Sequence, residues 1–511
     1  MSLARKIFSN TAWQFTGKAA TAVLGIISIK FITNYLSPTM YGEYTTIYDY
    51  TALFAIIADF GLFTIAVREM AHAADKKITE KIVGNVLGIR AALAVGAFAL
   101  AILAAYAIPA YHGSHIPRGV MIVSVATFFT LIAGTMSSVL QFSLRMMWAS
   151  VGLTIGKLIT VAYIVTSIVY IFPNAPEKGF PHLLFAWILG SCISLIITYF
   201  AARRIVPVRF QFDFPFWKNV FSKALPYGLA LVLGTMYFRM GTIVLSLFGM
   251  QEQIGFYGVP LRFLEILQIL PHYFMNSVLP VLTLRIKTAP HEGARVVRHS
   301  LNVLALLAFP MLVGGALLAW PITAAVSSPE FLTQRTADGF LWGSDLALKI
   351  LLVGLTGTYL HVVLSYALVA MGRQSEILAV NAVVVLINLS LNIILAPRFG
   401  FIGASVAAAL TEGCMLVFLA LRLRRHIRDI WDFSFFAKVG LSAAAMGIVI
   451  FISAQPLNAL LYSSSLFILI PLGAAVYAGA LFITKAITKE TLSRFFKPTG
   501  EISFPRELPP E

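Results

Sequence analysis

The sequence has 511 residues, of which 59% are hydrophobic and 12% are charged. Soluble domains carry about 25% charged residues, so this composition excludes an ordinary cytosolic enzyme. A net charge of +16 would suggest nucleic-acid binding in a soluble protein, but in a membrane protein it indicates basic residues retained on the cytoplasmic side. Cys192 and Cys414 lie in separate apolar runs, which predicts neither a disulfide nor a metal site, and we expect no nucleic-acid partner.

Fourteen apolar stretches of bilayer length follow one another along the chain. The first continues from a basic start to Leu36 without a cleavage-site pattern, which predicts a span rather than a signal peptide. Lipid cannot satisfy open backbone groups and the runs lack strand alternation, so the sequence predicts an all-α polytopic membrane protein. The expected spans are residues 10–36, 43–67, 82–110, 119–144, 147–172, 182–202, 224–248, 255–284, 299–326, 341–370, 376–395, 401–421, 439–454 and 460–484.

Basic residues are distributed unevenly between the two sides of this map. With a cytoplasmic N-terminus, the inner segments hold 27 of the 38 Lys and Arg residues, and the outer loops hold 4. Because positive charge is retained on the cytoplasmic side, this split predicts fourteen spans with both termini inside. The loops are short and no GxxxxGK[ST] phosphate loop occurs, so we expect a transporter rather than an enzyme.

A weak internal repeat divides the chain. The string LSPTMYGEY follows the first span and GMQEQIGFY follows the seventh, and a shift of 213 residues aligns Gly42 with Gly255 and Tyr44 with Tyr257. An even number of spans separates the copies, so they would be parallel repeats with a binding site between them. The expected parts are an N-terminal six-helix lobe (1–205), a C-terminal six-helix lobe (206–428), two additional spans (429–485) and a cytoplasmic tail (486–511).

Seven basic residues remain inside the spans, where a charge costs at least ~2.5–3.5 kcal/mol unless it faces a cavity, a partner or the interface. Arg262 is expected to pair with Glu265, and Asp345 with Lys349, because each pair lies one helical turn apart. Lys30 is expected to reach the outer interface. The candidate substrate-binding residues of a cationic cavity are Lys157 and Arg239, which lie deepest, followed by Lys18, Arg90 and Arg262.

Polar side chains recur on single helical faces of several spans. Such stripes fit either a cavity wall or hydrogen bonds between helices, and both readings stay open for the Asn stripe. His272 could be a packed residue or a proton carrier. The candidate lining residues are Gln14, Gln268, His272, Asn276, Asn381 and Asn388, and the carboxylates that could be counter-ions or coupling sites are Asp59, Glu265 and Glu412.

Three strings carry a family resemblance: FITNYLSPTMYGEYTTIYDYTALFAIIADFGLFTIAVREMA (31–71), SKALPYGLALVLGTMYFRMGTIVLSLFGMQEQIGFYGVPLRFLEILQILP (222–271) and LAPRFGFIGASVAAALTE (395–412). In this order they resemble the polysaccharide transporter, or O-antigen flippase, family of the multidrug/oligosaccharidyl-lipid/polysaccharide (MOP) exporter superfamily. Gly241 stands where family members often carry an Asp. The first span lacks the Arg-rich pattern of lipid II flippases.

The resemblance implies two six-helix lobes that rock between inward-open and outward-open states in the cytoplasmic (inner) membrane. It implies a polyprenyl-diphosphate-linked oligosaccharide as cargo, whose anionic head suits a cationic cavity. Polysaccharide assembly proteins and membrane lipids would be partners, without a cofactor and with a proton or sodium gradient as a possible energy source. The alternatives are a cation-coupled multidrug exporter, which should show an acidic or aromatic cavity, and a membrane-embedded polymerase or glycosyltransferase, which should show a large outer loop or an acidic cluster.

Overall fold

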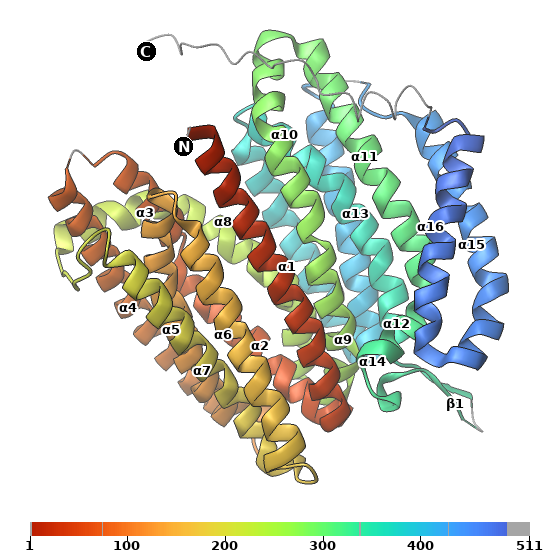
Figure 1. Ribbon diagram of the computed structural model, residues 1–511, viewed down its shortest axis with the longest axis horizontal. Helices are drawn as coiled ribbons and strands as arrows, with labels where there is room; N and C mark the ends of the chain where they lie inside the picture. The colour runs from red at the N-terminus through yellow and green to blue at the C-terminus, as the bar shows by residue number, and fades with distance from the viewer. Residues whose placement is uncertain (1–2, 74, 337–338, 428, 488–511) are drawn as a thin grey trace.

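The computed structural model describes residues 3–487 except 74, 337–338 and 428, and this part of the chain is almost entirely helical (Figure 1). The helices of the N-terminal half lie at the left of Figure 1, inclined to those of the C-terminal half at the right, and α1 runs between the two groups. The N-terminal half consists of α1 (Leu3–Tyr35), α2 (Pro38–Asp59), α3 (Leu62–Ala71), α4 (Lys76–Ala107), α5 (Ile116–Phe142), α6 (Met146–Thr166) and α7 (Pro176–Ala202).

The second half of the chain repeats this pattern and adds two helices. A small antiparallel hairpin, which the sequence analysis did not predict, lies in the loop before α13. The elements are α8 (Phe214–Leu247), α9 (Gln251–Leu267), α10 (Ile269–Thr288), α11 (Pro290–Leu317), α12 (Ala319–Val326), β1 (Gln334–Thr336), β2 (Gly339–Leu341), α13 (Ser344–Ala370), α14 (Gln374–Leu423), α15 (Phe433–Leu461) and α16 (Leu466–Ile483).

The helices confirm the predicted all-α polytopic fold. Eleven helical stretches of the described chain are long and apolar enough to cross a membrane. Two of these, residues 374–423 and 433–483, are 50 and 51 residues long, about twice what one crossing needs. The first is broken by Gly400, which has a left-handed φ of 57°, and the second by a short turn at Tyr462–Ser465. Together with the shorter apolar stretch 231–247, they account for fourteen crossings.

Several expected spans consist of two helices because particular residues interrupt the backbone hydrogen bonding. The span expected at 255–284 divides between α9 and α10, where Pro271 lacks an N–H and its ring excludes the carbonyl four residues earlier. That carbonyl, of Leu267, instead accepts a hydrogen bond from the Tyr359 hydroxyl at 2.9 Å. In the span expected at 43–67, Phe60 and Gly61 have positive φ angles and separate α2 from α3.

One expected local pair does not form. Asp345 is buried at the start of α13, where its Oδ1 accepts a hydrogen bond from the Thr333 backbone N–H at 2.8 Å. Lys349 is exposed one turn later and does not reach it. Spacing on the helix made the pair possible, but the carboxylate instead fixes the end of the preceding loop.

Candidate functional site

The two halves meet most closely where α2 packs against α9, and we call this contact the outer seam because both helices begin in predicted outer loops. A Cβ atom on Gly42 would lie 1.7 Å from the carbonyl oxygen of Gln251, and a Cβ on Gly255 would lie 2.0 Å from that of Pro38. These are the two glycines that the internal repeat aligns. Gly42 on α2 therefore allows the first turn of α9 to approach closely, and Gly255 on α9 does the same for the first turn of α2.

A second contact between the halves lies where α1 meets the end of α12. The Lys30 Nζ donates hydrogen bonds to the carbonyl oxygens of Ala324 and Ser327, both at 3.1 Å, and Thr33 donates to that of Val326 at 3.0 Å. Carbonyls in the last turn of a helix lack partners within the helix and carry partial negative charge, so a lysine is favourable there. Lys30, expected at the interface, thus caps α12.

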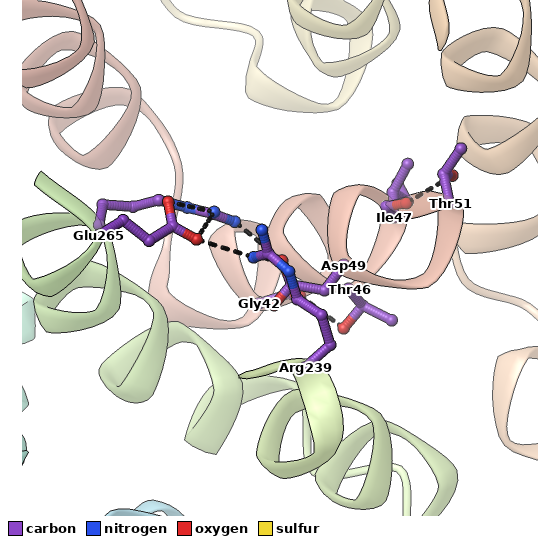
Figure 2. Close-up of polar contacts among 8 residues, drawn as sticks. Gly42, Thr46, Ile47, Asp49, Thr51, Arg239 and Glu265 are labelled. Atoms are coloured by element: carbon purple, nitrogen blue, oxygen red, sulfur yellow. Dashed lines mark hydrogen bonds and ion pairs between the residues drawn. The ribbon is translucent and has the colours of Figure 1, made fainter. Parts of the chain in front are cut away.

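Four charged side chains meet between the halves and form what we call the ion cluster: Asp49 on α2, Arg239 on α8, and Arg262 and Glu265 on α9. Figure 2 shows Asp49, Arg239 and Glu265 converging from these helices. The Asp49 side chain is fully buried, and its Oδ1 lies 2.5 Å from Arg239 Nη1 and 3.1 Å from Arg262 Nη2. Glu265 Oε1 lies 2.9 Å from an Nη1 atom of each arginine. Two positive and two negative charges therefore balance at this point.

The ion cluster contains one expected pair and one residue that the sequence analysis did not place in the site. Arg262 pairs with Glu265, as their helical spacing predicts. Arg239, predicted to be free for substrate, is compensated by two carboxylates in this arrangement. Asp49 was missed, although a signal existed: Asp49 and Arg262 are 213 residues apart, which is the repeat shift. Equivalent residues that face the axis between parallel repeats become neighbours.

A cavity of about 380 Å³ opens within the N-terminal half between α1, α5, α6 and α7, and we call it the N-half cavity. Two of the predicted cations line it. Lys157 Nζ lies 4.4 Å from the centre of the Trp187 ring, and Lys18 Nζ lies 5.2 Å from the centre of the Tyr273 ring. Neither lysine reaches a carboxylate anywhere in the described chain. The remaining polar lining consists of Gln14, Thr130, Ser137, Ser150, Thr160, Ser191 and Ser194.

Arg90, another predicted substrate residue, lies among α2, α4 and α5 rather than in the N-half cavity. Its side chain is 1% exposed and forms an ion pair with Asp59. It also donates hydrogen bonds to the Leu131 carbonyl at 3.1 Å and the Thr135 hydroxyl at 2.8 Å. Of the two roles left open for Asp59, this geometry favours that of a counter-ion.

Two of the cavities in the C-terminal half share a wall near the ion cluster. One, of about 60 Å³, is lined by the ion-cluster residues Arg239 and Glu265, and the other, of about 180 Å³, opens toward α10. Tyr237 and Glu412 line both. Gln268, Asn388 and Asn392 line the first cavity, and His272, His361 and Asn381 line the second.

The polar stripes also connect helices. Asn388 donates a hydrogen bond to Thr411 at 3.1 Å across the break in α14, and Asn276 accepts one from the Tyr366 hydroxyl at 2.8 Å. The Asn stripe therefore combines the two roles that the sequence left open. Gly241 packs against Tyr257, whose hydroxyl would lie 2.9 Å from a Cβ atom at this position, so an Asp there would displace that ring.

A family model described as "Polysaccharide biosynthesis protein" matches residues 7–284, more than half of the chain. The chain belongs to this family. Among its relatives are two proteins of Haloferax volcanii: "Probable flippase AglR", 26% identical over 233 residues, and "Probable low-salt glycan biosynthesis flippase Agl15", 23% identical over 235. These alignments cover 44% and 46% of this family member, and it spans about half the length of the two relatives, 47% and 48%.

Solved structures agree on the fold of this polysaccharide biosynthesis protein. It superimposes on the lipid II flippase MurJ in an inward closed conformation with a TM-score of 0.73 and 15% identity, covering 95% of this chain and all of the other. An inward-facing multidrug resistance MATE family transporter of the MOP superfamily gives a TM-score of 0.59 at 13% identity, covering 79% of this chain and 95% of the other. The family match and the shared fold confirm the family and the helical fold that the sequence resemblance implied.

Proposed function

We propose that this protein moves a polyprenyl-diphosphate-linked oligosaccharide from the inner to the outer leaflet of the cytoplasmic membrane by alternating access. The observation that carries the proposal is the N-half cavity, where two lysines without carboxylate partners lie beside a tryptophan and several hydroxyl groups. The two Haloferax relatives, both described as probable flippases, support the same function. An O-antigen or other polysaccharide repeat unit is the proposed glycan, passed on to assembly proteins.

The chemistry of the N-half cavity suits both parts of such a head group. Lysine ammonium groups are compact positive charges that bind phosphate oxygens through charge-assisted hydrogen bonds. Trp187 offers an apolar ring for a sugar face, and its orientation is fixed because its Nε1 donates to the Tyr44 hydroxyl at 3.1 Å and its ring packs on Tyr48. Serine and threonine hydroxyls can accept hydrogen bonds from glycan hydroxyls. The lipid tail would remain in the bilayer.

The ion cluster gives the transport cycle a defined step. Asp49 is the single member from the N-terminal half, so parting of α2 from α9 at the outer seam would remove it from both arginines. Arg239 and Arg262 would then retain only Glu265, leaving one positive charge uncompensated. We infer that the cargo diphosphate takes the place of Asp49 in the outward-open state, which gives these arginines their proposed contact with substrate.

A reconstituted flipping assay tests this function. The full-length protein in liposomes would receive a polyprenyl diphosphate carrying a fluorescent sugar, and a membrane-impermeant quencher would report the probe that reaches the outer leaflet. Because a hydrogen bond to a charged group contributes about 1.5–3 kcal/mol, Lys157→Ala and Lys18→Ala should each lower the rate roughly 10- to 150-fold. Lys349→Ala, an exposed lysine outside the cavities, is the matched control and should flip normally.

Three results would contradict the proposal. Full flipping by both cavity variants at normal protein levels would remove the site assignment. Transport of a cationic dye without any flipping of the glycan lipid would favour the multidrug exporter, and elongation of the glycan would indicate a polymerase. Repeating the assay with a proton or a sodium gradient would identify the energy source.

A further inference from the structure

One ionisable pair in the C-terminal half belongs neither to the N-half cavity nor to the ion cluster. His361 on α13 and Glu412 on α14 are mostly buried, with side chains 13% and 8% exposed, and His361 Nε2 lies 2.7 Å from Glu412 Oε2. We propose that this pair binds a proton and that its occupancy sets the balance between the outer-closed and outer-open arrangements. The proposal rests on the proposed alternating-access function, because it concerns the energy source of that cycle.

The choice of partner distinguishes Glu412 from the other carboxylates in the middle of the spans. Within the described chain, Asp49, Asp59 and Glu265 all pair with arginines, which remain protonated at every accessible pH. Glu412 pairs with a histidine, the side chain whose charge ordinarily changes between pH 5 and 8. The net charge of this one pair is therefore free to change, whereas the charges of the others are fixed.

The geometry identifies the atom that takes the proton. An ionised carboxylate only accepts hydrogen bonds, so the short contact requires the hydrogen of His361 on Nε2. The opposite ring nitrogen, Nδ1, is buried without a hydrogen-bond partner among the described residues. A proton arriving at Nδ1 converts a neutral imidazole beside a carboxylate, with net charge −1, into an imidazolium–carboxylate pair with net charge zero.

Neighbouring helices are shaped around the pair and give it access from two sides. Gly354 and Gly357 on α13 face Glu412, since Cβ atoms there would lie 3.4 and 3.3 Å from its side chain. Glu412 lines two adjoining cavities: one contains Arg239, and the other contains His361 and His272. The other titratable or charged groups facing this region are Tyr237 and Arg239 on α8, Tyr257 and Glu265 on α9, His272 on α10, Tyr366 on α13, Cys414 on α14 and Lys18 on α1.

A short route connects the pair to the outer closure. Tyr237 interacts with Glu412 and lies two residues before Arg239 on α8, and Arg239 holds Asp49 of the opposite half. Without the proton, the negative charge of Glu412 competes with Asp49 for Arg239, because Glu412 and Arg239 line the same cavity. With the proton, that competition ends and Arg239 returns to Asp49. Acidic pH should therefore favour the outer-closed arrangement, which is the direction required for protons entering from outside to reset a carrier.

The test uses protons alone, without glycan. Spin labels would be attached at Lys77→Cys and Lys287→Cys, which are exposed inner-side positions of the two halves, with Cys192 and Cys414 changed to serine. Pulsed electron paramagnetic resonance in nanodiscs would then report the distance between the halves. Between pH 8 and pH 5 we expect the long-distance population to rise. Glu412→Gln and His361→Gln should abolish this change. His426→Gln is the matched control and should leave the change intact, because His426 lies just beyond the end of α14 and pairs at 2.9 Å with Glu376 in the first turn of that helix.

The proposal would be overturned if the distance between the halves did not change with pH in the protein without these substitutions. It would also be overturned if the pH response persisted in both Glu412→Gln and His361→Gln. Glu412→Asp covers the case in which the other two variants do not fold: it retains the carboxylate and should displace the midpoint pH, and an unchanged midpoint also overturns the proposal. The distance measurement contains no glycan lipid, so its result does not depend on the cargo. An absence of flipping together with an intact pH response would therefore refute the proposed cargo but not the proposed proton site.

Discussion

The outer seam gives the sharpest prediction, because backbone rather than side-chain atoms define it. In Gly42→Ala the new Cβ would lie 1.7 Å from the Gln251 carbonyl oxygen, whereas ordinary contact begins at 3.4 Å. The oxygen belongs to the first turn of α9 and cannot rotate away as a side chain would. We therefore expect α2 and α9 to separate by roughly 1.7 Å, the difference between these two distances, and to loosen the seam.

The cost of this clash sets the size of the effect. Overpacking a well-packed contact costs about 1–3 kcal/mol, and the closed state alone contains the contact. The equilibrium between the outer-closed and outer-open arrangements should therefore shift about 5- to 150-fold toward the open one. Gly255→Ala should act in the same direction, because its Cβ would lie 2.0 Å from the Pro38 carbonyl oxygen.

Thiol labelling measures this shift. Thr46 is fully buried beside the seam, where its hydroxyl lies 3.1 Å from the Gln251 Oε1. A Thr46→Cys reporter should react with an impermeant outer-side reagent 5- to 150-fold faster, roughly the equilibrium shift, when Gly42→Ala is added. Gly96→Ala is the control, because a Cβ there meets nothing within 4 Å. Equal labelling rates in a folded Gly42→Ala protein and its parent would refute the argument that these glycines close the outer side.

Four further changes test the charges. Asp49→Asn should cost about 3 kcal/mol in the unfolding free energy, at the low end for a broken buried pair because Glu265 remains, and a double-mutant cycle with Arg262→Gln should show coupling. Asp59→Asn should lower the free energy of unfolding by about 3–5 kcal/mol, because it leaves Arg90 buried and unpaired. If Arg90 is structural, the variant that does fold should still flip lipid at the normal rate, and slower flipping would contradict a purely structural role. Lys30→Met should weaken closure by about 1–2 kcal/mol and speed Thr46→Cys labelling, and unchanged labelling would show that its bonds to α12 contribute nothing. At the start of α8, hydrogen bonds from Lys81 and from the Phe216 N–H lower the pKa of Asp213. The resulting stabilisation of the fold is present above the ordinary pKa of an aspartate and is lost as the pH falls through the lowered pKa. Melting curves of Asp213→Asn should therefore differ from those of the parent mainly above about pH 4 and converge with them below that pH.

The positions of the helices along the chain could be predicted from the sequence, because the thickness of the bilayer sets the length of each membrane-spanning helix. A span needs about 20 apolar residues, and this requirement alone located fourteen crossings, including the two within α14. The interruption at Pro271 has a local cause, because proline lacks the N–H that continues the helix. The hairpin β1–β2 could not be predicted, because its short strands carry no periodic signal.

The pairing of charges was predictable only where both partners lie on one helix turn. Arg262 and Glu265 satisfy that condition and pair, but Asp345 and Lys349 satisfy it equally and do not. Pairs such as Arg90 with Asp59 join different helices, and their contact depends on how those helices pack. The exception is Asp49 with Arg262, because the repeat shift relates the two positions. Internal symmetry thus carries information about long-range contacts that hydropathy does not.

The chemistry of each basic side chain explains the division of labour among the buried charges. Arginine stays protonated and offers several donors, so it suits the ion pairs with Asp49, Asp59 and Glu265. Lys18 and Lys157 lie over aromatic rings rather than carboxylates, so an arriving diphosphate need not displace an internal counter-ion from them. Histidine alone changes charge near neutral pH, and His361 is placed against a carboxylate that has no arginine partner in the described chain. A carrier needs permanent charges to hold its helices together and uncompensated charges to bind and release an anionic cargo. It also needs a charge that changes reversibly, so that the empty protein can return to its starting state.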